Sequence, residues 1–380
     1  MYQDQTGKSP SKAAQKTEKP VILVAPLDWG LGHVTRCIPL VHELVKQGAA
    51  PVLAGNEAAK ALLTEEFPHL PFLDLPGYDV RYAKTATGLF FNMIRQSGKI
   101  LTAIKKEHKW LKEQQAMHGF DAVISDNRYG LYHPDVYSVI MTHQLQIKSP
   151  VGGWSEAILR KRNYTYFSNF NSCWVPDFPE APGLAGDLSH PLKKPVTEIV
   201  YTGPLSRFRI VNQPIQKSHL LFIVSGPEPQ RTILENIFIN EMSHYNGTAA
   251  LVRGLPSSKG LIPSSNMLKV YNHLSAKDMQ EEMAKAEFVI GRCGYSTVMD
   301  IVALQKKSLL IPTPGQTEQE YLAAILPQKG IACTVSQKDF TLASSLGKAK
   351  SFTYHLPPPS QQPYLQQAVT RLLQQVHRQP

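Results

Sequence analysis

Residues 21–48 read VILVAPLDWGLGHVTRCIPLVHELVKQG and contain signals for one strand, one turn and one helix. The continuous apolar run Val21–Leu27 predicts a buried strand, because a strand covered on both faces loses the alternation of apolar and polar residues. From His33 to Gln47 the apolar residues recur at helical spacing, and Gly48 is a typical helix stop. A buried strand followed at once by an amphipathic helix is typical of a parallel α/β domain.

The alternation of strand and helix continues along the chain and starts a second time at His219. In the first half we expect further strands at 51–54, 122–125, 137–141 and 198–201, and a helix at 57–66. In the second half we expect strands at 220–225, 249–253, 267–271, 288–290 and 309–312, and a helix at 232–245. The chain is therefore expected to form two α/β domains, followed by a C-terminal helix at 362–377.

Composition suggests where these parts begin and end. The first 19 residues hold almost nothing that could be buried, and the segment before the second α/β domain contains two prolines and no clear period. We expect a disordered basic leader at 1–19, an N-terminal domain at 20–204, an interdomain linker at 205–217, a C-terminal domain at 218–356, and a proline break with the terminal helix at 357–380.

The chain has 380 residues and a formal net charge of +10, which favours an anionic partner such as nucleic acid, anionic lipid or a phosphorylated small molecule. No signature of a nucleic-acid-binding module is present, so specific nucleic-acid binding is not expected. The four cysteines lie far apart without CxxC pairs, which argues against structural zinc and disulfides and fits a reducing cytoplasm. The apolar runs have strand length, short of the ~20 residues of a membrane span.

A basic segment, Leu89–Gln115, interrupts the alternation with a helical period. Its apolar residues stand beside Arg95, Lys99, Lys105, Lys106, Lys109 and Lys112. One interpretation is a solvated helix pair with an ordinary core face. The other is a basic amphipathic surface that touches anionic lipid or a lipid-linked acceptor, which would place the protein at the inner face of the membrane.

The turn between the first strand and the first helix, Asp28–His33, lies where open α/β sheets bind ligands. Gly30 and Gly32 would let the backbone approach a ligand closely. His33 is a candidate general base because its ordinary pKa is ~6.5, although it could also only cap the helix. Asp126 follows another apolar strand and could orient the imidazole, as the acid does in a catalytic triad, or only begin a turn.

Polar turns in the second half are suited to a nucleotide. Between a strand and a helix, Gly294, Tyr295, Ser296 and Thr297 form a candidate phosphate cradle with the helix N–H groups. One turn later, Asp300 could bind a ribose diol or only stabilise the helix dipole. Further candidates are Gly226, Gln230 and Arg231 near a diphosphate, and Gln319 and Glu320 at sugar hydroxyls.

These motifs together resemble glycosyltransferase family 28: GlyLeuGlyHis at 30–33, SerGlyProGluProGlnArg at 225–231, ArgCysGlyTyrSerThrValMetAspIle at 292–301 and ProGlyGlnThrGluGlnGluTyr at 314–321. That family includes the enzyme that adds N-acetylglucosamine to the peptidoglycan lipid intermediate, and the plant galactolipid synthases. The resemblance is most specific over 220–327. It implies the GT-B architecture, in which two Rossmann-like domains face each other across a cleft, with 20–204 on the acceptor side and 218–356 binding the nucleotide-sugar donor.

The resemblance also implies roles for single residues. Asp300 would bind ribose, the helix start at 294–297 phosphate, and Gln319 with Glu320 the donor sugar. Arg207 matches a linker arginine near the phosphates, and Leu274 falls where backbone groups recognise the base. Because the family often has two glutamines at the sugar position, Glu320 departs from its pattern. The front loop also has fewer glycines than the family's GlyGlyThrGlyGlyHis.

The resulting prediction is a hexosyltransferase that moves a sugar from a nucleotide diphosphate, with UDP favoured, to an acceptor hydroxyl with inversion. No Asp-x-Asp pair is present, so neither a metal nor another cofactor is expected. Two alternatives stay open, a nucleotide-sugar epimerase and a non-catalytic nucleotide-sugar-binding partner subunit. A dehydrogenase is disfavoured because neither glycine turn completes the dinucleotide fingerprint.

Overall fold

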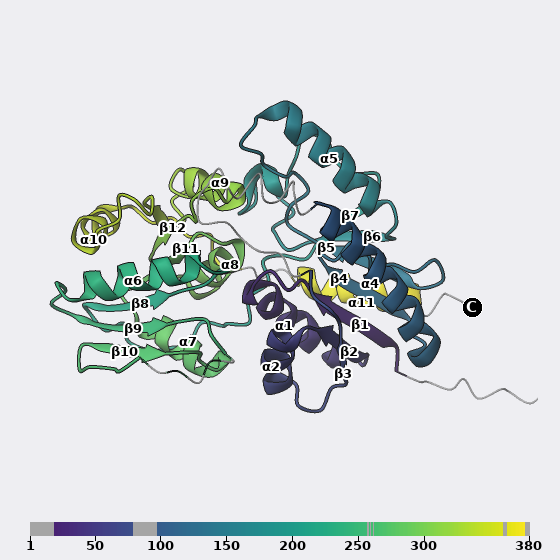
Figure 1. The fold of residues 1–380 in the computed structure, drawn as a ribbon, viewed down its shortest axis with the longest axis horizontal. Coiled ribbons are helices and arrows are strands. Elements are labelled where there is room, and N and C mark those ends of the chain that lie inside the picture. The colour runs from purple at the N-terminus through teal and green to yellow at the C-terminus, as the bar shows by residue number, and fades with distance from the viewer. Residues whose placement is uncertain are drawn as a thin grey trace, which may run out of the picture.

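The computed structural model describes residues 19–78, 97–256, 258, 260, 262–359 and 363–376. Within them the chain forms two parallel α/β sheets, one in each half (Figure 1). The sheet of the first half has the strand order β3-β2-β1-β4-β5-β6-β7. Its strands are β1 Val21–Pro26, β2 Ala50–Gly55, β3 Phe72–Asp74, β4 Ala122–Asp126, β5 Tyr137–Met141, β6 Ser172–Val175 and β7 Glu198–Tyr201.

Helices cover both faces of this sheet. They are α1 Leu31–Lys46, α2 Glu57–Glu66, α4 Ser97–His118 and α5 Gly153–Phe167, with a 3-10 turn at Gly186–Leu188. The inward side of α1 packs on the strands through Val34, Ile38 and Val41, which are buried in one apolar cluster. On the opposite face, Leu111 of α4 is buried against Leu23 and Val123.

The second sheet has the strand order β10-β9-β8-β11-β12-β13, which is the order of the first six strands of the first sheet. Its strands are β8 His219–Ile223, β9 Thr248–Val252, β10 Leu268–Tyr271, β11 Phe288–Arg292, β12 Ser308–Ile311 and β13 Cys333–Thr334. The helices of this half are α6 Gln230–Met242, α7 Ala276–Lys285, α8 Tyr295–Leu304, α9 Thr317–Ile325 and α10 Leu342–Ser351.

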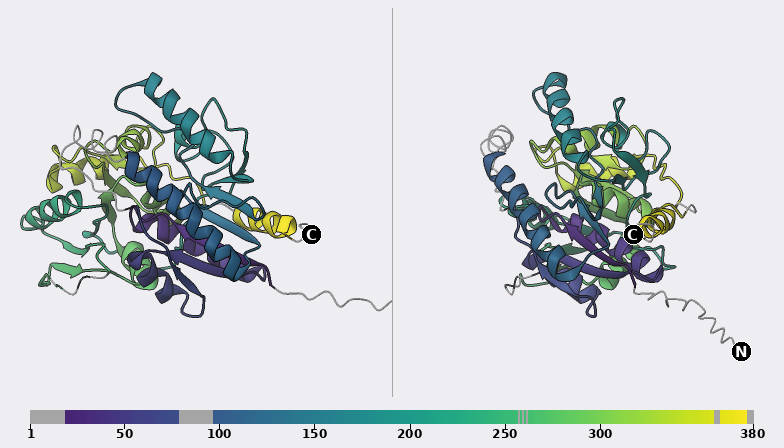
Figure 2. Two further views of the ribbon diagram at one scale, coloured as in Figure 1. Left: turned by 45° about the vertical axis from the view of Figure 1, so that its right-hand side comes forward. Right: turned by 90° about the vertical axis from the view of Figure 1, so that its right-hand side faces the viewer.

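The terminal helix α11, Tyr364–Val376, returns to the first half of the chain, as Figure 2 shows in both views. Its residues Val369 and Leu372 belong to the same core as α1. Thr370 donates to the side-chain oxygen of Gln47 at 2.8 Å, and Arg371 pairs with Glu198 on β7. Although α11 comes last in sequence, it therefore completes the N-terminal domain.

The expected fold class, two α/β domains of the GT-B type with a C-terminal helix, is confirmed. Patterning did not predict the strands β3, β6 and β13 or the helices α5 and α10, which have short or weakly periodic sequences. The expected helical segment at 89–115 is a helix from Ser97 to His118, and residues 89–96 lie outside the described residues. The expected leader at 1–19 also falls there, except for Lys19.

The strand order fixes where a site can form. In the first sheet the order reverses between β1 and β4, and in the second between β8 and β11. In open α/β sheets, ligands bind beyond the carboxyl ends of the strands at such a switch point. His33, Asp126, Gly226 and Gly294 lie at or just beyond that end of these four strands.

Candidate active site between the two domains

The first turn of α1 presents His33 beside the sheet. The helix begins at Leu31, and its N-cap is Gly30, whose φ of 146° lies in the region that favours glycine. Gly30 has no side chain that could make a capping hydrogen bond at this helix start. The N-cap position is thus occupied by Gly30, and the hydrogen bonds of the His33 side chain go to Asp126 and Arg36.

Asp126 ends β4, the neighbour of β1, and its carboxylate meets the imidazole. The distance from His33 Nδ1 to Asp126 Oδ2 is 3.1 Å. Asp126 is fully buried, whereas 19% of the His33 side chain is exposed. Among the described residues, His33 Nε2 has no recorded hydrogen-bond partner. The pair thus has the geometry of a histidine oriented by an acid, with the second ring nitrogen available.

A buried arginine, Arg36, stands between this pair and the rest of the site, and sequence reasoning missed it. Its Nε donates to Asp126 Oδ2 at 2.8 Å, and its Nη2 donates to Asp126 Oδ1. Nη2 also lies 2.9 Å from His33 Nδ1. The signal was present in the sequence, because Arg36 follows His33 by three residues and so shares its helix face.

The charges of this cluster set its protonation. Burial alone would raise the pKa of Asp126, but the neighbouring Arg36 and His33 outweigh it and lower that pKa to about 2. Burial and then the charge of Arg36 lower the pKa of His33, against the opposing effect of Asp126. At neutral pH, Asp126 is therefore ionised and His33 is neutral, which is the state a general base requires.

A neutral imidazole can satisfy only one of its two Nδ1 neighbours. If Nδ1 carries the proton, it donates to Asp126 and leaves the Nε2 lone pair free; if Nδ1 is bare, it accepts from Arg36. Only the first tautomer can act as a base through Nε2. Asp126 favours that tautomer, as the acid of a triad does.

The two domains touch at this point. Ser296, in the first turn of α8, donates from its hydroxyl to the Gly32 carbonyl at 3.0 Å. A Cβ atom on Gly32 would lie 2.7 Å from the Ser296 hydroxyl, so the close approach requires glycine. Beside it, the Tyr295 hydroxyl donates to the Pro176 carbonyl at 2.8 Å. The N-termini of α1 and α8 therefore meet, which brings the candidate base next to the candidate phosphate cradle.

A second bridge runs through His143, which follows β5, and Glu318, in the first turn of α9. His143 Nε2 lies 2.9 Å from Glu318 Oε1, and Gln144 donates to the other oxygen of the same carboxylate. The His143 ring stacks on Tyr295 with 4.3 Å between centroids, and its Nδ1 lies 3.2 Å from Arg36. Contacts thus run without a break from Asp126 through Arg36 and His143 to the C-terminal domain.

The structure places Asp300 and Arg207 together, as the candidate ribose and phosphate residues should be. Asp300 Oδ1 accepts from the Ser206 hydroxyl at 2.6 Å. Burial raises the pKa of Asp300 to about 6, although Ser206 and the charge of Arg207 oppose the rise. Arg207 Nε is buried without a hydrogen-bond partner in the structure. Both groups thus keep bonding capacity for a ligand.

The side chains of Gln319 and Glu320 accept hydrogen bonds from backbone N–H groups of the loop that precedes α9. Gln319 Oε1 accepts from the Thr313 N–H at 2.9 Å, and Glu320 Oε1 accepts from the Gly315 N–H at 2.7 Å. The N-cap of α9 is Gln316, whose side chain accepts from the Gln319 N–H. A sugar-binding role for Gln319 and Glu320 stays a prediction, and their free lone pairs would have to supply it.

Arg231, after β8, was expected to reach a diphosphate, but its guanidinium is paired with two carboxylates. Arg231 is buried and pairs with Glu228 at 2.6 Å and with Glu235 at 2.5 Å. Gly226, with φ of 97° and open space around its Cα, is accessible to a ligand, whereas the Gln230 side chain is buried. Leu274 is buried in an apolar cluster beneath the second sheet. The roles predicted for these residues remain predictions.

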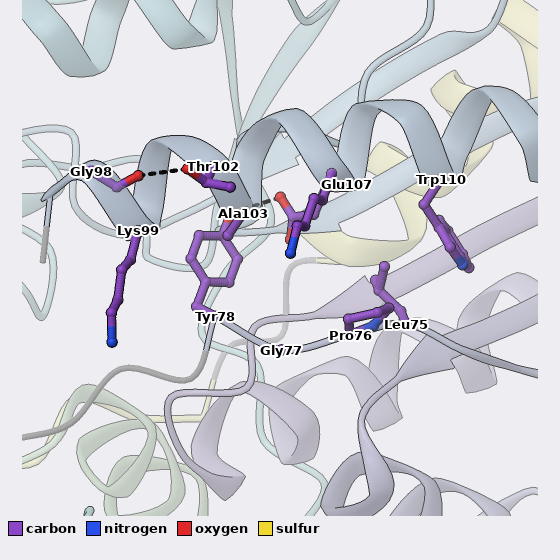
Figure 3. Close-up of a pocket in the computed structure, with 11 residues that line it drawn as sticks. Leu75, Pro76, Gly77, Tyr78, Gly98, Lys99, Thr102, Ala103, Glu107 and Trp110 are labelled. Atoms are coloured by element: carbon purple, nitrogen blue, oxygen red, sulfur yellow. Dashed lines mark hydrogen bonds between the residues drawn. The ribbon is translucent and has the colours of Figure 1, made fainter.

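A cavity of about 390 Å³ lies between α4 and the segment Leu75–Tyr78 (Figure 3). At its wall the Tyr78 hydroxyl donates to Glu107 at 2.7 Å, and Arg128, buried behind the lining residues, pairs with the same carboxylate at 2.7 Å. Asp28 accepts from the Tyr78 N–H at 3.0 Å, which ties the cavity to the turn before His33. Within the described residues, no group of three or more His, Cys, Asp or Glu could hold a metal ion.

Comparison with known proteins fits this geometry. Residues 261–370 match the glycosyltransferase family 28 C-terminal domain, which confirms the resemblance for that part of the chain. Over 174 residues the chain is 27% identical to a UDP-N-acetylglucosamine–N-acetylmuramyl-(pentapeptide) pyrophosphoryl-undecaprenol N-acetylglucosamine transferase of Haemophilus ducreyi. That alignment covers 44% of this chain and 48% of that protein, so the chain spans about half the length of this curated relative.

Two further proteins resemble most of the chain. An uncharacterized glycosyltransferase of Methanosarcina acetivorans is 23% identical over 330 residues, covering 79% of this chain and 82% of that protein. The structure of Phytolacca americana UGT2 complexed with UDP-2-fluoro-glucose and pterostilbene superposes with a TM-score of 0.57 at 14% identity, covering 95% of this chain and 99% of that one. The likeness between the structures shows that the fold is shared.

Proposed function

We propose that this chain, which carries a glycosyltransferase family 28 C-terminal domain on a GT-B fold, transfers a hexosyl group from a nucleotide diphosphate sugar to an acceptor hydroxyl. One observation carries the proposal. The His33–Asp126 pair of the N-terminal domain adjoins the first turn of α8, since Gly32 accepts from Ser296 at 3.0 Å. A base and a phosphate-binding helix start therefore meet at a single place.

In the proposed reaction, His33 Nε2 takes the proton of the acceptor hydroxyl while its Nδ1–H donates to Asp126. The acceptor oxygen forms a bond to the anomeric carbon as the bond from that carbon to the diphosphate oxygen breaks. General-base assistance of this kind contributes about 10²–10⁴-fold in rate. Asp126 stabilises the imidazolium that forms, as the triad acid does.

The leaving diphosphate gathers negative charge, which the C-terminal domain would stabilise. The N–H groups at the start of α8 would bind it, because the N-cap is Gly294, which has no side chain to cap them. Arg207 would add a positive charge from the linker, where its buried Nε has no hydrogen-bond partner among the described residues. Preorganised donors of this type are effective because they need no reorganisation during the reaction.

The finer parts of the proposal rest on resemblance. A UDP-linked donor is supported by the names of the Haemophilus ducreyi relative and of the Phytolacca americana complex. The proposed reaction is an inverting displacement. It needs no metal, because Arg207 and the helix N–H groups would stabilise the leaving group. Asp300 would accept from the ribose hydroxyls.

The test has two stages. Thermal shift with UDP, ADP, GDP and TDP identifies the nucleobase of the donor. Incubation with the corresponding sugar nucleotides, with and without chelator, then measures turnover. We expect His33→Ala to lower turnover by about 10²–10⁴-fold with donor affinity unchanged. The matched control is His42→Ala, since His42 lies on the same helix with an exposed side chain paired to Glu66. A His33→Ala protein with parental turnover would refute the assignment of the base.

A further inference from the structure

Glu318 is a carboxylate of the C-terminal domain whose hydrogen-bond partners belong to the N-terminal domain. It stands in the first turn of α9, and 15% of its side chain is exposed. One carboxylate oxygen lies 2.9 Å from His143 Nε2, and the other accepts from the side chain of Gln144. Both oxygens therefore bind residues that follow β5, and the carboxylate joins the polar cluster around the candidate base.

The contacts of His143 define its protonation state. Arg36 Nη1 lies 3.2 Å from His143 Nδ1, and a guanidinium has donors only. His143 Nδ1 must therefore hold a lone pair, which makes the imidazole neutral and puts its proton on Nε2, where it donates to Glu318. His143 is 3% exposed and its ring stacks on Tyr295, so that its orientation is fixed.

The charges of this cluster do not balance while the candidate base is neutral. Burial would raise the pKa of the Glu318 carboxyl, but its neighbours, His143 foremost, lower it. The pKa of Asp126 is about 2, so both carboxyl groups are ionised at neutral pH. With two carboxylates and one guanidinium, from Arg36, the described residues of the cluster have a net charge of −1. Uptake of one proton by His33 brings this charge to zero.

Other titratable groups of the described residues face the cluster from neighbouring elements, and they are Cys37 of α1, Cys293 after β11 and Tyr295 of α8. Burial raises the pKa of all of them, so they are uncharged at neutral pH. A further carboxylate, Asp177, faces Tyr295 and accepts from the N–H groups of residues 184 and 185. The charge count of the cluster is therefore set by Asp126, Arg36 and Glu318.

We infer that Glu318 is a positioning residue for the base: held by His143, its charge favours the imidazolium that His33 becomes when Nε2 takes the acceptor proton. That imidazolium forms beside Asp126 and Arg36, whose charges cancel as a pair. The second carboxylate supplies the missing counter-charge, because an opposite charge nearby favours the charged form of a titratable group.

This counter-charge comes from the donor-side domain. Glu318 belongs to α9, and α8 of the same domain packs beside α1, the helix of His33 (Figure 1). The contact between the domains therefore brings the carboxylate to the base, and His33 is a stronger base with the C-terminal domain in place than without it. This role rests on the proposed function, because it takes His33 as the base of the transfer.

The direct test is the titration of His33, followed by NMR of the full chain with isotope-labelled histidine, without donor or acceptor. The His33 signal is identified by its loss in His33→Ala. Glu318→Gln keeps an oxygen that can accept from His143 and removes the charge, so His33 should titrate at lower pH than in the parent. The matched control is Asp187→Asn, which removes a carboxylate that also lies at the domain contact but is 66% exposed and paired with Lys148. It should leave the titration of His33 unchanged.

Turnover gives a second measurement. Glu318→Gln should lower kcat about tenfold, which is part of the ~10²–10⁴-fold that a general base contributes, because a weaker base removes the acceptor proton less effectively. The acid limb of the pH–rate profile should move to lower pH, and the donor Kd should stay at the parental value. His143→Gln can still accept from Arg36 and donate to Glu318, so it should retain most of the turnover. His143→Leu can form neither bond and should lose as much as Glu318→Gln.

Three results would each overturn the inference: a parental His33 titration in Glu318→Gln, an equal change in Asp187→Asn, or a His143 signal that shows an imidazolium at neutral pH. A weaker donor Kd in Glu318→Gln with an unchanged titration would make Glu318 a contact of the donor instead. If the parent turns over none of the sugar nucleotides, the proposed function fails, whereas the titration still tests the charge coupling because it needs neither substrate. Thermal unfolding of each variant verifies that the fold is intact.

Discussion

Replacing Arg36 with Met should destabilise the protein by about 3 kcal/mol. Arg36 is 2% exposed and Asp126 is fully buried, and two guanidinium nitrogens bind the two carboxylate oxygens. Removal of one partner of a buried ion pair costs about 3–5 kcal/mol, because the remaining charge is left uncompensated. The lower end of this range applies, because His33 stays at 3.1 Å as a second partner for Asp126.

The stability that this ion pair contributes should also depend on pH. A carboxyl whose folded pKa is about 2, against an ordinary value of 3.8, contributes about 2 kcal/mol above pH ~4 that is lost as the pH falls toward 2. In Arg36→Met this loss should be much smaller, because the pKa of Asp126 is no longer held down by the guanidinium. Stability should therefore differ most between parent and variant at neutral pH and least in acid.

The assay is urea unfolding followed by tryptophan fluorescence, for Arg36→Met, Asp126→Asn and the double variant. Because the double variant leaves no unpaired charge, its loss of stability should fall well short of the sum of the two single losses. Lys46→Met, at the exposed end of the same helix, is the control and should change stability by less than about 0.5 kcal/mol. Additive losses, or a parental stability for Arg36→Met, would refute the reasoning about this ion pair.

Three further results are expected. Nucleotide-sugar affinity, measured by calorimetry, should weaken as the pH falls through about 6, because Asp300 takes up a proton there. Asp300→Asn should weaken binding by ~1–3 kcal/mol at neutral pH and remove this pH dependence. If the affinity of the Asn variant still changes with pH, Asp300 is not the titrating group. Gly32→Val should separate the two domains at this contact and lower turnover, because the new Cβ would lie 2.7 Å from the Ser296 hydroxyl. Adding Ser296→Gly to that variant should partly restore turnover. Equal small-angle scattering from the parent and Gly32→Val would contradict this prediction. The acid limb of the pH–rate profile should lie below pH 6.5, since burial and Arg36 lower the pKa of His33 and the base must be neutral; a limb above 6.5 would count against His33.

Local signals allowed much of the fold to be predicted. The helix 57–66 and the strands 137–141 and 198–201 have the predicted bounds, because each is a periodic segment between clear stops. The proximity of His33 and Asp126 also follows from sequence, since both residues follow strands that end at one edge of a parallel sheet. β13 has two residues, which is too short for any periodicity to show.

Residues whose roles depend on tertiary placement were not predictable in this way. His143 follows a predicted strand, and Glu318 lies among several polar residues near a helix start, so neither position stands out in the sequence. Their contact, at 2.9 Å, joins positions 175 residues apart on different domains, and no pattern in one sequence specifies the relative placement of two domains. Arg36 belongs to an intermediate case, because its helix face was predictable and its buried carboxylate partner was not.

The two sheets explain why the candidate site lies where the domains meet. Each sheet has its switch point between the first and fourth strands of its own domain, β1 and β4 or β8 and β11, and each offers a crevice at the carboxyl ends of those strands. In the proposed transfer, the first crevice supplies the base and the second supplies the cradle for the leaving diphosphate. The first has the His33–Asp126 pair, and the second has the open helix start at Gly294. The proposed transfer therefore depends on the contact between the domains, and we expect Gly32, Ser296 and Glu318, which form this contact, to be needed for turnover.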